Sequence, residues 1–371
     1  MRILIASDKY KGSLTATEVA QTIARVLGTE IPESECDLCP IADGGEGTTE
    51  AMVTALGGEW VIMDTVDAQM RPRQARYGLC ANQAVMEMSA ASGLALVNDL
   101  PQAPEVASTY GTGLMIAHAL KQGAERILIG IGGSATNDGG LGMAAALGFQ
   151  FLDQAGQTVP PVMREVMRVE RIQPPESPFL IPILVACDVD NPLLGERGAT
   201  RVYGAQKGVK EITWFEDRLA RLANIAAHDL RVDLRDIPGA GAAGGLGWGL
   251  MAFCGAKLTN GFDLVAEQIG LEPRVMEADL VITGEGRLDS QTLYGKGPVG
   301  IAQMARRLGK PVVAFAGAVE DSDELRSHFD FTRSIKPADM PLSEAIARAE
   351  TLLAMAVRES IPQLRKLLNL E

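Results

Sequence analysis

Residues 278–318 read "ADLVITGEGRLDSQTLYGKGPVGIAQMARRLGKPVVAFAGA", and this stretch decides the fold. The apolar runs "ADLVIT" and "PVVAFAGA" are predicted strands, and "PVGIAQMARRLG" between them is a predicted helix. A strand, a helix and a second strand in this order are typical of an α/β protein with a parallel sheet, in which the helices cover the faces.

The start of the chain repeats this order. The predicted strand "RILIA" comes before a helix over "TATEVAQTIARVLG", in which Thr15 and Glu18 are placed as a capping box. A second strand, "DLCPIA" (37–42), and the helix "TEAMVTALGG" follow. Near the C-terminus, "FDFTRSI" is a further short strand and "SEAIARAETLLAMAVRESI" (343–361) a long final helix. Two strands from the front and three from the back therefore predict a doubly wound, five-stranded parallel sheet with helices on both faces.

The middle of the chain is predicted to be an insertion with its own α/β core. It contains the alternating runs "EWVIMDTV" and "QAVMEMS", the buried strand "LIPILVAC" and the helix "EITWFEDRLARLANIAAH". A further strand and helix flank the loop "GIGGSATNDGG" (130–140). This mixture indicates a mixed sheet. We therefore expect one domain from residues 1–70 and 260–371 and a second, inserted domain from 71–259.

Composition limits the functional classes. The chain has 371 residues, 47% of them hydrophobic, and a net charge of −13, which disfavours nucleic acid and anionic membranes as partners. No apolar run approaches a membrane span, and the start of the sequence lacks a secretory signal. The five cysteines are odd in number and scattered, which is typical of reduced thiols in a cytoplasmic protein.

Polar and glycine-rich loops follow the predicted strands or begin the predicted helices. Ligands of open parallel sheets bind beyond the carboxyl ends of the strands, so these loops are the candidate site. The candidate substrate- or phosphate-binding residues are Asp8, Ser13, Gly44, Gly45, Glu46, Gly132, Gly133, Ser134, Thr136, Asn137, Asp138, Asn191, Lys207, Gly284, Glu285, Gly286 and Lys296.

One interpretation of the glycine-rich loop is an NAD(P)-dependent oxidoreductase of a small hydroxy acid. Gly130, Gly132 and Ala135 fit G-x-G-x-x-A after a strand, and Asp153 ends the next apolar run. Against this, Asp138 would lie near the helix N-terminus, where a pyrophosphate would meet its carboxylate. A sensor that binds a sugar acid without turnover is a third class, but it leaves the acid-rich loops unexplained.

A phosphate–Mg²⁺ site accounts for the mixture of residues better. Glycine-rich loops bind phosphate oxygens, Mg²⁺ takes one or two carboxylates, and lysine or arginine neutralises the charge of a transferring phosphoryl group. The chain has no Walker A motif, protein-kinase motif set or G-x-S-x-G elbow. Its histidines, His118, His228 and His328, lie in or beside predicted helices and are not candidate catalysts.

The strand-end segments together resemble the bacterial two-domain glycerate kinases. They are "SDKYKGSLTATEVA", "ADGGEGTTEAM", "GIGGSATNDGGLGMAAALG", "ACDVDNPLLGERGA", "YGAQKG", "PGAGAAGGLGWGL" and "VITGEGRLDSQTLYGKGPVGIA", in order from residue 1 to beyond 300. The resemblance implies phosphorylation of D-glycerate with ATP and Mg²⁺. It also implies a flavodoxin-like domain built from both chain ends, an inserted α/β domain and a site in the cleft between them. It favours 2-phosphoglycerate as the product and leaves 3-phosphoglycerate and the oligomeric state open.

Individual roles are hypotheses from strand-end position and chemistry. Asp188, just past a buried strand, is the expected general base for the glycerate hydroxyl. The other candidate catalytic residues are Lys11, Asp43, Arg287 and Asp289. Asp43, Glu285 and Asp289 are expected to orient Mg²⁺ or a lysine, with Glu285 and Asp289 as the metal ligands. Lys11, Arg287 and Lys296 would hold phosphates or the substrate carboxylate. For each acid, a helix N-cap or a turn residue is the alternative.

Overall fold

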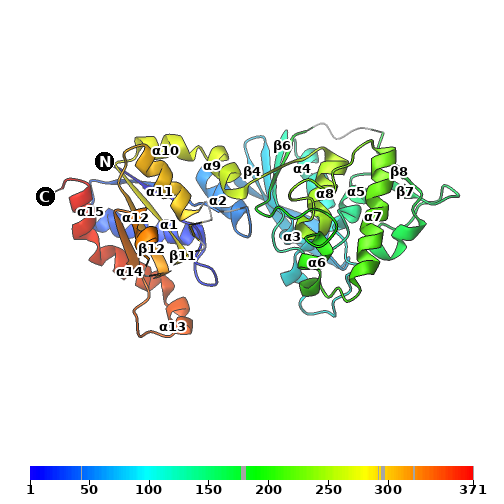
Figure 1. The fold of residues 1–371 in the computed structure, drawn as a ribbon. Helices are drawn as coiled ribbons and strands as arrows, with labels where there is room; N and C mark the ends of the chain where they lie inside the picture. Colours follow the sequence, from blue (N-terminus) through cyan, green and yellow to red (C-terminus); the bar gives the residue numbers. More distant parts are fainter. Residues whose placement is uncertain (43, 177–180, 291, 294–296, 321, 371) are drawn as a thin grey trace. The chain divides into compact units, whose positions relative to one another are not determined.

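The chain divides into two compact units. The computed structural model describes residues 1–42, 44–176, 181–290, 292–293, 297–320 and 322–370 (Figure 1). The first unit consists of Met1–Asp43, Glu50–Gly58 and Phe262–Glu371, and the second of Gly44–Thr49 and Glu59–Gly261. The chain therefore passes between the units after residues 43, 49, 58 and 261, whereas the sequence prediction placed boundaries near 70 and 260 only.

The first unit contains the predicted five-stranded parallel sheet. Its strand order is β13–β12–β11–β1–β2, and every pair is parallel. The strands are β1 (Arg2–Ile5), β2 (Glu35–Leu38), β11 (Leu280–Leu288), β12 (Val312–Val319) and β13 (Phe331–Ser334). This is the flavodoxin-like order, which reverses between β1 and β11. The prediction of a doubly wound sheet built from both chain ends is confirmed.

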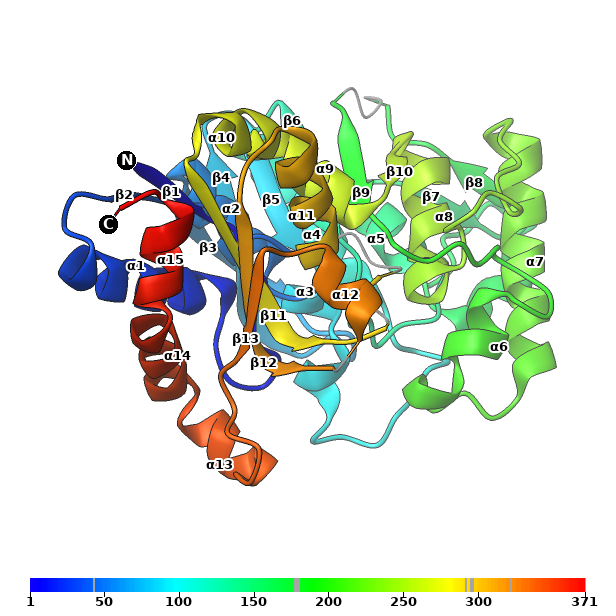
Figure 2. The same ribbon diagram turned by 60° about the vertical axis from the view of Figure 1, so that its left-hand side comes forward.

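Helices cover both faces of this sheet (Figure 2). α1 (Ala16–Glu30) and α14 (Ala349–Glu359) pack against one face, where Ile3, Ile5 and Phe315 lie fully buried in one cluster with residues of both helices. α10 (Leu271–Glu277) and α11 (Pro298–Arg307) contact β1, β11 and β12. The capping box of α1 is confirmed, since Glu18 N donates to Thr15 Oγ1 at 3.2 Å and Thr15 N donates to Glu18 Oε2 at 2.8 Å.

Two predicted elements of this unit have different bounds. The strand predicted at 37–42 is β2, which ends at Leu38, before Pro40, because proline has no N–H to donate to a ladder. The single helix predicted at 343–361 is three helices, α13 (Leu342–Ala347), α14 and α15 (Ile361–Leu367). The break before α15 fits a proline in its first turn, a position where the missing N–H costs nothing.

The second unit is built on a mixed six-stranded sheet in the order β10–β9–β6–β5–β4–β3. The neighbours β3, β4 and β5 are antiparallel, and β5, β6, β9 and β10 are parallel. The strands are β3 (Glu59–Val66), β4 (Pro72–Cys80), β5 (Gln83–Glu87), β6 (Arg126–Gly130), β9 (Ile183–Ala186) and β10 (Lys257–Thr259). The predicted mixed sheet is confirmed, and β3 belongs to it rather than to the first unit.

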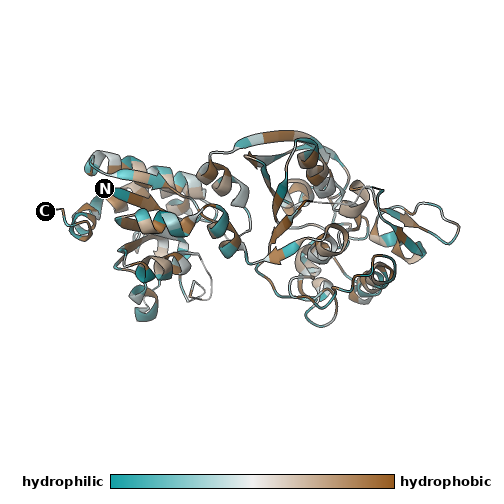
Figure 3. Ribbon diagram, turned by 90° about the horizontal axis from the view of Figure 1, so that it is seen from above, coloured by the Kyte–Doolittle hydropathy of each residue, from teal (hydrophilic) through white to brown (hydrophobic). Residues whose placement is uncertain are grey.

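Further helices and a small two-stranded sheet complete the second unit. The remaining elements of the chain are α2 (Thr48–Leu56), α3 (Ser89–Ser92), η1 (Leu94–Val97), α4 (Tyr110–Lys121), α5 (Leu141–Ala146), β7 (Gln150–Leu152), η2 (Met163–Arg168), β8 (Arg171–Gln173), α6 (Ala199–Tyr203), η3 (Ala205–Lys207), α7 (Ile212–Asp229), α8 (Ala242–Cys254), α9 (Gly261–Gln268) and α12 (Asp323–Ser327). Of these, β7 and β8 form the small sheet, while α12 and most of α2 and α9 belong to the first unit. The strands of both units carry long hydrophobic stretches (Figure 3). Among the described residues, no helix is long and apolar enough to cross a membrane. All five cysteines are free.

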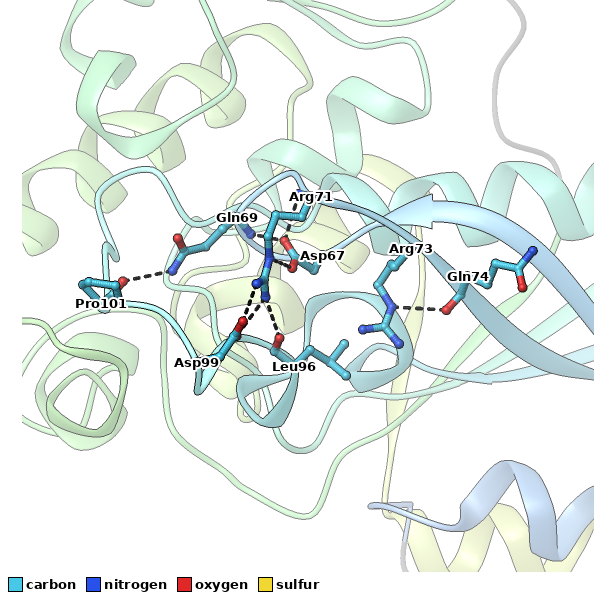
Figure 4. A network of polar contacts seen from close by, with 8 residues as sticks. All are labelled: Asp67, Gln69, Arg71, Arg73, Gln74, Leu96, Asp99 and Pro101. Atoms are coloured by element: carbon cyan, nitrogen blue, oxygen red, sulfur yellow. Dashed lines mark hydrogen bonds and ion pairs between the residues drawn. The ribbon is translucent and has the colours of Figure 1, made fainter.

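A polar network fastens the β3–β4 turn to the segment before α4 (Figure 4). Asp67 Oδ1 accepts from the backbone N–H groups of Gln69 and Arg71 at 2.8 and 3.0 Å, and its Oδ2 accepts from Arg71 Nε at 2.5 Å. The same guanidinium donates to both oxygens of Asp99, at 2.6 and 3.1 Å, and to Leu96 O at 2.8 Å. The network therefore fixes the chain that leads to Thr109, at the start of α4.

Replacing Asp67 with alanine is expected to lower the free energy of unfolding by about 2 kcal/mol, because Asp67 is 3% exposed and its loss leaves the backbone N–H groups of Gln69 and Arg71 without their acceptor. Urea unfolding measures this. The matched control is Asp64→Ala, an exposed aspartate on β3 that accepts from Gln74, for which a change within about 0.5 kcal/mol is expected. Equal losses in the two variants would contradict the role of the network.

Candidate active site

The first group of candidate residues lies at the carboxyl ends of β1 and β11, at the point where strand order reverses. The sequence prediction ended the second of these strands at Thr283, but β11 runs on to Leu288 and stays paired with β12, so residues 284–287 are strand residues and not part of a loop. Asp8 N and Ser7 Oγ both donate to Gly284 O, at 2.8 and 2.9 Å. A Cβ at Gly284 would lie 1.8 Å from Phe315 O, and one at Gly286 would lie 3.1 Å from Lys11 N. Glycine at 284 thus lets β11 and β12 lie close together, and glycine at 286 lets β11 approach the loop after β1. The structure brings Asp8 and Lys11 to the same carboxyl end of the sheet as residues 284–286.

The acidic residues of this group are linked by a threonine. Thr292 Oγ1 donates to Glu285 Oε1 at 2.7 Å and accepts from Asp289 N at 3.1 Å. Arg287 Nε lies 3.0 Å from Asp289 Oδ2, but its side chain is 69% exposed, so this pair contributes little stability. Thr292, which the sequence analysis did not single out, therefore links Glu285, within β11, to Asp289, the first residue after it.

Tyr10 connects the loop after β1 to β12 from inside the protein. It is buried, and its hydroxyl donates to Phe315 O at 2.7 Å. Burial, and secondly the negative charge of Glu285, raise the pKa of Tyr10, so the phenol stays protonated. Ser13 Oγ donates to Tyr10 O at 2.9 Å, which places this predicted ligand residue in a turn. Two further predicted residues, Asp43 and Lys296, lie outside the described residues.

The donors of this group suit a hard cation bound together with phosphate. Within the part of the chain that the structure describes, no group of three or more histidine, cysteine or acidic side chains could hold a metal ion. Mg²⁺ bound with a phosphate needs only one or two carboxylates, because water and phosphate oxygens complete its octahedron. Glu285 and Asp289, which Thr292 links, are residues of the type that such a site needs, so the donor set fits Mg²⁺.

The second group lies at the carboxyl ends of the parallel strands of the second unit. Asp188 comes two residues after the end of β9 and is exposed. Its Oδ1 accepts from Asn260 Nδ2 at 2.7 Å and from Gly261 N at 2.8 Å, where β10 leads into α9. The expected general base thus lies at a strand end, as predicted, and it also contacts the first residue of a helix. Both roles are compatible with one carboxylate.

The segment Gly44–Thr49 lies directly on these strand ends. Gly44 has φ +90°, and a Cβ there would lie 2.5 Å from Ala186 Cβ and 2.9 Å from Gly261 Cα. A Cβ at Gly130 would lie 2.5 Å from Gly44 O, and one at Gly132 would lie 3.4 Å from Gly45 Cα. These glycines allow two glycine-rich loops, predicted separately from the sequence, to lie side by side. Glu46 is exposed beside them.

Asp138, in contrast, is fully buried and binds the protein itself. Its Oδ2 accepts from Thr109 N and Thr109 Oγ1, both at 2.8 Å, and from Gly142 N at 3.2 Å. Its Oδ1 accepts from Gly140 N at 3.2 Å. Burial raises the pKa of Asp138, and the hydrogen bonds from Thr109 and the two glycines oppose that rise. The carboxylate therefore fixes the loop to the start of α4 and of α5.

Lys207 holds the same loop from the other side. It is 2% exposed, and its Nζ donates to Ser134 Oγ at 2.6 Å and to Thr136 O at 2.7 Å. Close by, Asn137 Nδ2 donates to Thr200 Oγ1 at 2.9 Å. These residues, predicted to bind phosphate or substrate, therefore have partners within the protein. The part of the loop that is exposed is Gly132 and Gly133. Asn191, also a candidate, donates to Arg197 O in its own loop and accepts from the Tyr203 hydroxyl of α6.

Stability is expected to rise with pH above neutrality because of Lys207. Burial lowers its pKa from 10.5 to about 7, although the charge of Asp138 opposes the shift. Between these two values the unfolded chain binds more protons than the folded protein, so the unfolding free energy increases with pH, by at most about 1.4 kcal/mol per unit. The cysteines, whose pKa values burial raises, contribute a slope of the opposite sign near their ordinary pKa, so the comparison is made below that range. By urea unfolding at about pH 7 and 8, the slope should be more positive in the wild type and in Lys210→Met, an exposed control, than in Lys207→Met. A slope unchanged in Lys207→Met would contradict the assignment.

The nicotinamide interpretation fails on its structural context. Asp153 accepts from the N–H groups of Ala155 and Gln157 in a turn, at 3.0 and 2.9 Å. The strand before it, β7, pairs with β8 in a separate two-stranded sheet and not with β6. A dinucleotide fold needs the acidic residue at the end of a strand beside the first one.

Comparison with known proteins identifies the family. A family model described as the glycerate kinase family matches residues 3–365. The chain belongs to the glycerate kinase family. It is 43% identical over 365 residues to a glycerate kinase from Halalkalibacterium halodurans, covering 96% of each chain. It is 42% identical over 338 residues to the glycerate 2-kinase of Escherichia coli K12, covering 86% of each.

A solved structure supports the fold. The crystal structure of a protein provisionally named glycerate kinase 2, from Salmonella typhimurium LT2, superposes with a TM-score of 0.89 at 41% identity, covering 99% of this chain and 98% of that one. The glycerate kinase family is one of phosphotransferases. Its match along nearly the whole chain decides against both the oxidoreductase and the non-catalytic sensor.

Proposed function

We propose that this member of the glycerate kinase family transfers the terminal phosphoryl group of ATP to D-glycerate in the presence of Mg²⁺, and that the product is 2-phosphoglycerate. The observation that carries this proposal is the family match over residues 3–365, which spans both groups of strand-end loops. The 42% identity to a protein named glycerate 2-kinase supports transfer to the 2-hydroxyl. The free cysteines are what a reducing compartment favours, so we further propose a cytoplasmic location.

Asp188 is the proposed general base. A carboxylate at a strand end can accept the proton that the glycerate hydroxyl loses as it attacks phosphorus. The hydrogen bonds from Asn260 and Gly261 to Oδ1 fix the orientation of the group.

The residues at the carboxyl ends of β1 and β11 are the proposed site that binds Mg²⁺ and neutralises the charge of the phosphates. Glu285 and Asp289 would hold Mg²⁺, which when bound neutralises charge on the transferring phosphoryl group. Lys11 and Arg287 are exposed cations at the same edge and would bind phosphate oxygens or the glycerate carboxylate. We assign the same tasks to Asp43, beside Mg²⁺, and to Lys296, at a phosphate.

The second glycine-rich loop has a divided role in this proposal. Its exposed residues Gly132 and Gly133, next to Gly45, would face the substrate through backbone groups, since glycines permit close approach. The buried side chains of Asp138 and Lys207 would act indirectly, without touching the substrate, by holding that backbone in place.

The proposal is tested by measuring ADP release with ATP and Mg²⁺ and three acceptors. D-glycerate should support turnover. D-lactate, which has only the 2-hydroxyl, should support a slow reaction, and 3-hydroxypropanoate, which has only the 3-hydroxyl, should support none. EDTA should abolish release with D-glycerate. Release that does not depend on D-glycerate, or that persists in EDTA, would contradict the proposed function.

A further inference from the structure

Glu87 is an acidic residue at the end of β5 that no sequence motif singled out. It is the last residue of the strand and pairs with Gly130, the last residue of β6. It therefore lies at the carboxyl edge of the parallel strands, beside the glycine-rich loop that begins after Gly130. Its side chain is partly buried.

The carboxylate of Glu87 binds the beginning of α2. Glu87 Oε1 accepts from Gly47 N at 3.1 Å and from Thr49 N at 2.9 Å. N–H groups at the start of a helix have no acceptor within the helix, and the helix dipole favours a negative charge there. A residue about forty positions away in sequence thus performs the capping that a local side chain usually performs.

The same segment is fixed at its other end by shape. Gly44 fits against Ala186 and Gly261 with no room for a side chain, and its carbonyl oxygen lies close to Gly130. The segment is thus fixed by close packing at Gly44 and by hydrogen bonds at Gly47 and Thr49. Gly45 and Glu46 lie between these two fixed points. The backbone of Gly45 consequently lies beside Gly132, in the exposed part of the second glycine-rich loop.

We propose that Glu87 is a positioning residue for phosphoryl transfer: it holds the loop of residues 44–49 against the strand ends so that its glycine backbone faces the substrate. This inference rests on the proposed function. Glu87 acts through hydrogen-bond acceptance at a fixed distance. Glutamine, with an amide oxygen at the same position, can replace it, whereas aspartate, one methylene shorter, cannot reach both N–H groups.

Steady-state kinetics of Glu87→Ala, Glu87→Gln and Glu87→Asp test the proposal. For D-glycerate, kcat/KM should fall about 10- to 100-fold in Glu87→Ala, because a small displacement of a substrate-positioning loop has effects of this size. It should stay within about 5-fold of wild type in Glu87→Gln and fall by about 10-fold or more in Glu87→Asp. Glu125→Ala is the matched control, since Glu125 is an exposed glutamate of the same unit that accepts from Asn82 at 2.6 Å. It should have wild-type kinetics.

Amide hydrogen exchange gives a readout independent of turnover. Exchange at Gly47 and Thr49 should become faster in Glu87→Ala and Glu87→Asp and stay near wild type in Glu87→Gln. If Glu87→Ala does not fold, the test is the comparison of kcat/KM between the other two variants. A higher kcat/KM in Glu87→Asp than in Glu87→Gln would overturn the proposal. Faster exchange with unchanged kcat/KM would overturn it too. An inactive wild type would contradict the proposed function, whereas an active wild type matched by Glu87→Ala would contradict only this inference.

Discussion

Replacing Asp138 with alanine is expected to lower the free energy of unfolding by about 3–5 kcal/mol or to prevent folding. The side chain is 0% exposed and accepts four hydrogen bonds, two of them from Thr109. Its removal leaves backbone N–H groups at the start of α5 buried without an acceptor. It also leaves the charge of Lys207 without the carboxylate that opposes the loss of its proton.

Urea unfolding followed by circular dichroism measures this loss, and Asp153→Ala is the matched control. Asp153 also accepts backbone N–H groups in a turn, but its side chain is 22% exposed, so a loss of only about 1 kcal/mol is expected. Asp138→Asn, which keeps the shape and some of the acceptor capacity, should lie between the two. A loss at Asp138 no larger than at Asp153 would contradict the structural role of the buried carboxylate.

Replacing Asp188 with asparagine is expected to lower kcat at least about a hundredfold while leaving the unfolding free energy nearly unchanged. The asparagine Oδ1 can still accept from Asn260 and Gly261, so the start of α9 keeps its contacts. The amide cannot take a proton from the glycerate hydroxyl. This substitution therefore separates the function of a base from that of a helix cap.

The control for Asp188 is Asp190→Asn, two residues further along the same loop. Asp190 is exposed and pairs with Arg197 at 2.7 Å, and its replacement should leave kcat close to the wild-type value. A near-normal rate for Asp188→Asn would mean that its carboxylate serves only to position α9, and the role of general base would be withdrawn.

The parallel sheet of the first unit was predictable because its strands are fully buried. Residues such as Ile3, Leu4, Val281 and Val313 form short continuous apolar runs, and the helices between them carry clear caps or faces. The position of β3 was not predictable in this way. "EWVIMDTV" alternates as any half-buried strand does, and its pairing with β4 depends on contacts that periodicity does not encode.

The positions of the site residues were predictable, but the partners of their side chains were not. Strand-end position correctly placed Asp188 just after β9, whereas residues 284–288, predicted as a loop, are the last part of β11. Nothing in "GGSATNDGG" indicates that Asp138 turns inward, because its main partner, Thr109, comes from another helix. An isolated acid ending the run "QAVME" was the one available signal for Glu87, and it becomes meaningful only once the loop of residues 44–49 is seen to lie on it.

The measurement that tests the central claim most directly is the ³¹P NMR spectrum of the protein incubated with D-glycerate, ATP and Mg²⁺. The proposed function predicts a new phosphomonoester signal coupled to a single proton, because the carbon that bears the 2-hydroxyl of glycerate carries one hydrogen. Coupling to two protons would contradict transfer to the 2-hydroxyl. Unchanged ATP with no new signal would contradict glycerate as the acceptor.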